Sequence, residues 1–250
     1  VTTSHLYLVA GLGPGTHAHK LAVFRAQDFE PFSALAVRYN VNVVGGSHFV
    51  LQGEKLLNVA FLFHRDGRID RQPKLHITPD ETRWWGVAPG DRINVFDTDR
   101  GKVAILLGYD VQFPEICRIA RAKGANIFFV PFNTDERRGY LRVRHCAQAR
   151  AIENEVYCVL SGATGTLPFV DNADVHYAQS AILTPSDFAF ARDAVAAPTQ
   201  SNTETFLIQD VDTEVLRRHR SSGVGRTFEK RRPDLYAVLY KDPDEGDQLI

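Results

Sequence analysis

The feature that most constrains the fold is residues 103–115, where an apolar run changes abruptly into a helical pattern. Residues 103–107 have the length and apolarity of a buried strand, which ends at Gly108. Pro114 and Glu115 then open a helix, because proline and an acid both favour the first helical turn. A buried strand that breaks sharply into a helix often carries an enzyme nucleophile, since the next backbone N–H groups can face an oxyanion. Here the residue at the break is a glycine.

Strands and helices alternate on both sides of this break. Strands are expected at 6–9, 41–44, 57–64, 69–75, 93–97, 127–131, 156–161, 179–183 and 205–211, and helices at 29–39, 115–123, 140–154 and 213–220. This alternation, mixed with hairpins, predicts an α/β fold with helices outside and sheets inside. We expect one domain over residues 1–250, with about 221–250 forming a C-terminal arm.

Composition excludes several classes of protein. The chain has 250 residues, 44% of them apolar, and a net charge of −1, which argues against a general polyanion binder. Cys117, Cys146 and Cys158 have unrelated spacings, so neither a disulfide framework nor a zinc site is expected. No apolar run approaches the ~18 residues of a membrane helix, and no basic segment precedes the first apolar run. These features predict a cytoplasmic protein that does not bind membranes.

Two local patterns have competing interpretations. Lys74 stands near a strand end, where a lone lysine is usually a surface charge. Residues 217–232 are rich in arginine and could form a nucleic-acid patch, but no aromatic interleaving accompanies the charges. A solvated basic face is the simpler interpretation, and no nucleic-acid partner is predicted.

Three separate blocks together resemble a known family. Residues 71–76 (RQPKLH), 108–115 (GYDVQFPE) and 149–154 (ARAIEN) resemble signature blocks of the nitrilase superfamily of carbon–nitrogen hydrolases. The resemblance runs in order over about residues 29–211. It is nearest to the nitrilase-like amidohydrolase domain that some bacterial proteins carry after an acetyltransferase-like domain, which residues 83–87 and 134–137 resemble in particular.

The resemblance implies a four-layer α-β-β-α sandwich that associates as a homodimer or larger homo-oligomer. It also implies hydrolysis of a non-peptide C–N bond in a small amide, carbamoyl or nitrile substrate, without a metal or an organic cofactor. The family uses a cysteine nucleophile, a glutamate base and a lysine. A thiol needs a nearby base and a positive neighbour to react as thiolate. The start of the family domain is expected to be missing from this chain.

The family's roles transfer residue by residue. The lysine corresponds to Lys74, and a second, supporting glutamate to Glu81. Gly108 occupies the nucleophile position, where cysteine is expected, and the N–H of Tyr109 corresponds to the oxyanion donor. Two further roles follow from the motif positions. Asp110 and Glu115 brace the turn, and the substrate site is lined by Phe132, Asn133 and Thr134.

Two family positions depart from the pattern. Glycine stands at 108, and the base glutamate aligns with Gly11. Loss of the nucleophile predicts an inactive chain, with a rate lower by a factor on the order of 10⁶. Glu30 could act as the base instead, but its helical context favours a surface role. The three cysteines could replace the nucleophile, but they are expected to pack in the core or an interface. The glycine at 108 could be natural, engineered or misread, and the alternative function is a non-catalytic binding or assembly protein.

Overall fold

The computed structural model describes residues 14–23, 29–167 and 175–250. It divides into two compact units, the first formed by Val1–Asp91 with Thr166–Val175 and the second by Arg92–Gly165 with His176–Ile250. The strand expected at 6–9, and Gly11 after it, lie outside the described residues.

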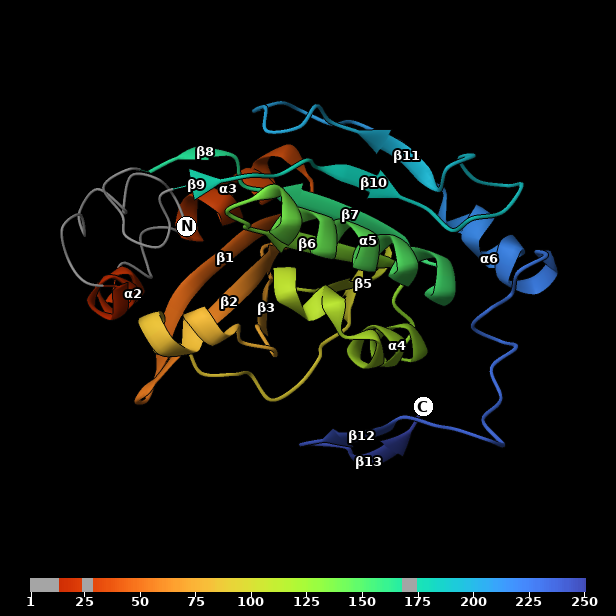
Figure 1. Cartoon of the computed structure of the whole chain (residues 1–250), viewed down its shortest axis with the longest axis horizontal. Coiled ribbons are helices and arrows are strands. Elements are labelled where there is room, and N and C mark those ends of the chain that lie inside the picture. Colours follow the sequence, from red (N-terminus) through yellow and green to blue (C-terminus); the bar gives the residue numbers. More distant parts are fainter. Residues whose placement is uncertain (1–13, 24–28, 168–174) are drawn as a thin grey trace. The chain divides into compact units, whose positions relative to one another are not determined.

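The first unit contains a three-stranded antiparallel sheet. Its strands are β1 (Val43–Gln52), β2 (Lys55–Phe63) and β3 (Ile69–Pro73), with β2 in the centre (Figure 1). Two helices belong to the same unit, α2 (Pro14–Val23) and α3 (Phe29–Tyr39), and the second has the predicted bounds. Helix α3 places Phe29 against Phe61 of β2, with ring centroids 4.2 Å apart. This aromatic contact anchors the helix on the sheet.

Strand β1 corrects the expectation of a short strand at 41–44 ending at two glycines. The strand continues through Gly45 and Gly46, and its pairing with β2 shifts register between Val44 and Ser47. Such a bulge absorbs extra residues without ending the strand. Gly45 is also required for space, because a Cβ there would lie 2.7 Å from the ring of Phe63.

The second unit is built on a six-stranded mixed sheet with the order β11-β10-β7-β6-β5-β4. The three strands β5, β6 and β7 run parallel, and the outer pairs are antiparallel. The strands are β4 (Phe96–Thr98), β5 (Gly101–Ile105), β6 (Ile127–Phe132), β7 (Tyr157–Gly162), β10 (Ala181–Leu183) and β11 (Val195–Pro198). Parallel strands are buried on both faces, which explains why residues 103–107 and 127–130 are nearly all apolar.

Helices of the second unit follow the predicted positions closely. They are α4 (Pro114–Ala122), α5 (Arg137–Asn154) and α6 (Thr213–Ser222), and α4 packs beside α5 (Figure 1). The C-terminal segment ends in a hairpin of β12 (Leu239–Asp242) and β13 (Gly246–Leu249). Two short strands, β8 (Gly165–Thr166) and β9 (Val175–His176), complete the described elements.

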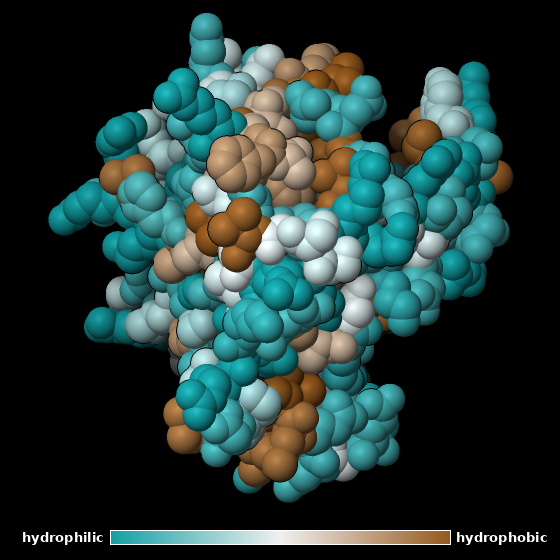
Figure 2. Space-filling model, turned by 90° about the vertical axis from the view of Figure 1, so that its right-hand side faces the viewer, coloured by the Kyte–Doolittle hydropathy of each residue, from teal (hydrophilic) through white to brown (hydrophobic). Residues whose placement is uncertain are grey.

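The strand expected at 205–211 is wrong. This segment forms no strand, although it contains a short apolar run of strand-forming type, residues 206–208. Phe206 and Ile208 are 95% and 90% exposed. An apolar run becomes a strand only where a neighbouring strand supplies hydrogen bonds, and no described strand pairs with this segment. The face drawn in Figure 2 is mainly hydrophilic, with separate hydrophobic patches.

Candidate active site

The predicted strand-to-helix break is present in the second unit. Strand β5 ends at Ile105, and Gly108 begins a short 3₁₀ turn, η3 (Gly108–Gln112), that leads into α4. Gly108 has φ +44°, in the left-handed region that side chains other than glycine rarely adopt. Nucleophile elbows hold their reactive residue in such a strained turn. The backbone at 108 therefore has the form that the sequence predicted for an elbow.

There is room for a side chain at position 108. A Cβ built on Gly108 would lie 3.4 Å from the Cβ of Phe132 and 3.9 Å from the carbonyl oxygen of Pro131. These are close but ordinary contacts, so the obstacle to a larger residue is the positive φ. The structure thus brings Phe132, one of the predicted substrate residues, against the nucleophile position.

Residues after Gly108 hold the turn. Asp110 is buried, and its Oδ2 accepts a hydrogen bond from the N–H of Leu107 (3.2 Å). The N–H of Asp110 in turn donates to the carbonyl of Leu107 (3.1 Å). Tyr109 is the second residue of the turn, where helical geometry leaves backbone N–H groups without an acceptor in the helix. The oxyanion role of that donor stays a prediction.

Glu115 lies in the first turn of α4 and is exposed. Its negative charge there is favourable to the helix dipole. No hydrogen bond to the elbow is recorded for its side chain among the described residues. Its predicted bracing role remains a prediction.

Arg150 on α5 is a bracing residue that the sequence did not single out, although it lies in the third signature block. It is 7% exposed, and its Nε and Nη2 donate to the carbonyls of Val111 (3.0 Å) and Gln112 (3.1 Å). Its Nη1 donates to Oε1 of Glu153 (3.0 Å). One guanidinium therefore ties the end of the elbow turn to α5 and is neutralised by its own helix.

Asn133 and Thr134 follow the end of β6, after Phe132. Oδ1 of Asn133 lies 2.7 Å from Nδ1 of His176, and Oγ1 of Thr134 donates to the carbonyl of Tyr177 (2.7 Å). Both polar groups thus fasten the loop to residues 176–177. Only Phe132 of the three predicted substrate residues borders position 108 in these contacts.

Lys74 and Glu81 form a close pair in the first unit. Nζ of Lys74 lies 2.7 and 2.6 Å from the two carboxylate oxygens of Glu81, which sits in a π-helical turn, η2 (Glu81–Trp85). Thr78 donates to Oε2 of Glu81 from its N–H (2.9 Å) and from Oγ1 (3.0 Å). Lys74 is 7% exposed, so its ammonium loses most of its hydration on burial. The contacts with Glu81 compensate for this loss. The interpretation of Lys74 as a surface charge is therefore wrong.

The backbone of Lys74 is also held on both sides. Its N–H donates to the carbonyl of Asn58 (2.8 Å), and its carbonyl accepts from the N–H of Gly90 (2.8 Å). A side chain at Gly90 would place its Cβ 2.7 Å from Cβ of Pro73. Strand β2 and the 79–90 loop therefore fix the position from which Lys74 extends.

The alternative nucleophiles are packed in the core. Cys117 and Cys158 are 0% exposed, and burial raises the pKa of both thiols above the ordinary value. Thiols in that state are not reactive thiolates. Cys146 is half-buried on α5, and Glu30 is exposed in the first turn of α3.

The described part of the chain contains no cluster of three potential metal ligands among its His, Cys, Asp and Glu residues. None of its helices has the length and apolarity to cross a bilayer.

Comparison with known sequences agrees with the three signature blocks. A family model described as carbon-nitrogen hydrolase matches residues 9–221. The probable hydrolase YhcX of Bacillus subtilis is 50% identical over 240 residues, which cover 96% of this chain and 47% of that protein. The chain thus spans about half the length of this relative. The omega-amidase NIT3 of Saccharomyces cerevisiae is 27% identical, over 82% of this chain and 70% of the relative.

Solved structures show the same fold. Saccharomyces cerevisiae Nit3, of branch 10 of the nitrilase superfamily, is similar with a TM-score of 0.67 and 26% identity, over 78% of this chain and 68% of that one. The carbon-nitrogen hydrolase of Helicobacter pylori G27 has a TM-score of 0.76 at 22% identity, over 89% and 79% of the two chains.

Proposed function

Because this chain belongs to the carbon–nitrogen hydrolase family, we propose that its site is built to hydrolyse the C–N bond of a small amide, with the nucleophile missing at position 108. The observation that carries the proposal is the left-handed backbone of Gly108 between a buried strand and α4. Relatives named omega-amidases support a terminal carboxamide as the substrate group. With Gly108 in place, the chain is expected to be inactive.

In the proposed reaction a thiolate at 108 attacks the carboxamide carbon. The amide nitrogen takes a proton and leaves as ammonia, a thioester forms, and water then hydrolyses the thioester and restores the thiol. By the family resemblance, Lys74 and the N–H of Tyr109 correspond to the groups that stabilise the oxyanion. Glu81 positions Lys74, because both of its oxygens already contact the ammonium. The base position aligns with Gly11, so the chain as it stands lacks the proton acceptor as well.

Restoring the two missing groups tests this proposal. We expect the Gly11→Glu, Gly108→Cys double variant to form an acyl adduct and release ammonia from short molecules with a terminal carboxamide. Mass spectrometry of the intact protein and an ammonia assay measure the two steps. Lys74→Ala in that background should lower the rate on the order of 10²–10³-fold, as for loss of an oxyanion donor.

The matched control is Gly108→Ala with Gly11→Glu, which has the same backbone strain but no thiol. It should form no adduct. Adduct formation in this control, or ammonia release by the unaltered chain, would contradict the assignment of position 108. Full activity of the Lys74→Ala variant would contradict the role of Lys74.

A non-catalytic binding or assembly protein is the second candidate, and the glycine at 108 favours it. Such a protein would keep the Lys74–Glu81 pair as an anchor for a carbonyl or carboxylate ligand. In a thermal-shift assay the unaltered chain should then be stabilised by small amides without ammonia release. An unchanged melting temperature throughout the amide panel would count against it.

Our proposal extends to the architecture. A single four-layer α-β-β-α domain, a homodimer or larger homo-oligomer and a cytoplasmic location all rest on the family resemblance, and light scattering would measure the oligomer. Kinship with the bacterial branch that carries an acetyltransferase-like domain rests on the resemblance of residues 83–87 and 134–137 alone.

A further inference from the structure

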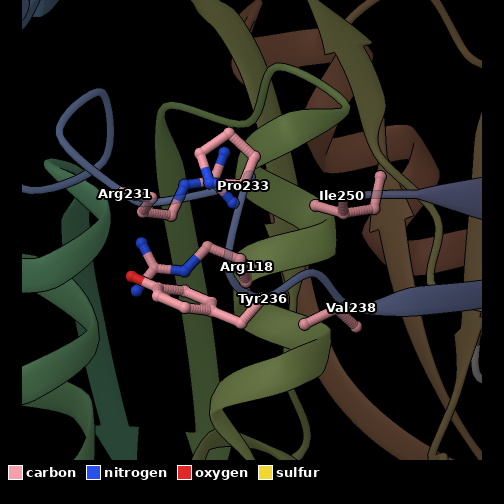
Figure 3. A pocket seen from close by; sticks show the side chains of 6 residues that line it. All are labelled: Arg118, Arg231, Pro233, Tyr236, Val238 and Ile250. Carbon is pink, nitrogen blue, oxygen red and sulfur yellow. The ribbon is translucent and has the colours of Figure 1, made fainter.

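The second unit contains a cavity that the proposed reaction does not use. It lies between α4 and the C-terminal segment and has a volume of about 90 Å³ (Figure 3). A water molecule occupies about 30 Å³ in the liquid, so the space suits a group of a few heavy atoms. The cavity is lined by Arg118, Arg231, Pro233, Tyr236, Val238 and Ile250.

Positive charge is concentrated beside this cavity. The guanidinium groups of Arg118, Arg121 and Arg231 lie 5.5, 4.4 and 4.0 Å from the centre of the Phe228 ring. Burial, together with neighbouring arginines, lowers the pKa of Arg118 and Arg121 from the ordinary value. A guanidinium nevertheless stays protonated at neutral pH, so the charges persist.

Among the described residues, these arginines form no direct ion pair with a carboxylate, although the charge of Glu153 acts to raise the pKa of Arg118, and the charges of Glu155 and Glu229 act to raise that of Arg121. The carboxylates nearby are engaged elsewhere, because Glu153 pairs with Arg150, Glu229 with Arg226 and Asp234 with Arg232.

Arg118 and Arg231 donate hydrogen bonds to backbone carbonyls. Nη1 of Arg118 donates to Glu153 (2.8 Å), and Nε of Arg231 donates to Phe228 (2.8 Å). A guanidinium has five N–H donors, so donors remain on both side chains. Figure 3 shows Arg118 beside the ring of Tyr236, with Arg231 and Pro233 on the same side of the cavity.

We propose that this cavity binds a phosphate-type oxyanion, free or carried on a small molecule, between Arg118 and Arg231. Two forked guanidinium groups match the geometry of a tetrahedral oxyanion, and the Tyr236 hydroxyl adds a donor. The apolar side chains of Val238 and Ile250 leave room for the carrier. Because Arg118 is on α4 and Arg231 is on the C-terminal segment, the bound anion joins these two parts of the chain.

Calorimetric titration of the whole chain with inorganic phosphate, at constant ionic strength in a chloride buffer, tests the site. We expect saturable binding with a dissociation constant in the millimolar range or below. Arg231→Gln and Arg118→Gln should each weaken binding about tenfold or more, the effect of losing a charged hydrogen bond. Methyl phosphate binding more tightly than phosphate would indicate a carried group, and the reverse a free anion; either supports the site.

Arg232→Gln is the matched control. It removes the same charge next to Arg231, but Arg232 is exposed and pairs with Asp234. It should bind phosphate as the unaltered chain does. If Arg118→Gln does not fold, Arg231→Gln and Arg231→Lys decide, with circular dichroism as the folding check. Absence of saturable binding, equal binding of acetate, or equal weakening by Arg232→Gln would each overturn the proposal.

Discussion

At the scale of single residues, Phe132 lies between two glycines that resist substitution for different reasons. On one side is Gly108, where a Cβ would fit at 3.4 Å but the backbone φ of +44° disfavours any side chain. On the other is Gly162, where a Cβ would lie 2.5 Å from the Phe132 ring and 2.3 Å from Cβ of Ala178. Cysteine is thus tolerable at 108, at a strain cost of about 1–2 kcal/mol, whereas any side chain at 162 must displace its neighbours.

Gly162→Ala should therefore destabilise the protein. Overpacking a filled site typically costs about 1–3 kcal/mol. Here the added methyl must displace the Phe132 ring or Ala178, which precedes β10 in the chain. Urea unfolding followed by circular dichroism measures the free energy of unfolding.

Gly225→Ala is the control for that substitution. No atom lies within 4 Å of a Cβ built on Gly225, so its free energy of unfolding should change little. A Gly162→Ala protein as stable as this control would show that Phe132 has space to move.

At the scale of elements, patterns that act locally were the most predictive. Helix α3 has the bounds predicted from its apolar face, and α4 begins at Pro114, one residue before the predicted start. The prediction of a strand at 205–211 was wrong, and the hairpin of β12 and β13 was not predicted. Both errors arise because strand formation depends on a partner elsewhere in the chain.

That hairpin is held to α4 by an ion pair. Nζ of Lys123 lies 2.7 Å from Oδ2 of Asp242, and it lies 5.0 Å from the centre of the Tyr240 ring. The hydrogen bond from Lys123, followed by those from the N–H groups of Asp244 and Glu245, lowers the pKa of Asp242 from 3.8 to about 2. Lys123 therefore joins the end of α4 to the C-terminal hairpin.

The sign of the pH dependence follows from the lowered pKa. Asp242 stabilises the folded state fully above its ordinary value of 3.8, and this stabilisation is lost as pH falls toward about 2. In Lys123→Gln the pKa of Asp242 should rise toward 3.8 but stop short of it, since the backbone donors remain. Carboxyl carbon chemical shifts followed by NMR measure the value, and an unchanged pKa would contradict the assigned cause.

At the scale of the whole molecule, the open question is whether the two units fold together. The prediction of one domain requires a single cooperative transition. Both tryptophans, Trp84 and Trp85, belong to the first unit, so tryptophan fluorescence reports that unit alone. Far-ultraviolet circular dichroism reports both units.

We expect the two probes to give coincident urea unfolding curves with the same midpoint. A fluorescence midpoint separate from that of circular dichroism would show that the units unfold independently. Repeating the measurement with Gly162→Ala sharpens the test, because a substitution in the second unit should shift the fluorescence curve only if the two units are coupled.

The sequence alone determined the family, the elbow at 108 and the helices α3, α4, α5 and α6, because each depends on neighbouring residues: an apolar run, a proline at a helix start, or three short blocks in order. It also predicted position 108 as that of the nucleophile. It did not predict α2. Only the tertiary structure decided that Glu81 is committed to Lys74, that Arg150 holds the carbonyls of the elbow, and that Arg118 meets Arg231 at one cavity. Those contacts join residues whose approach is decided by packing, which no local pattern encodes.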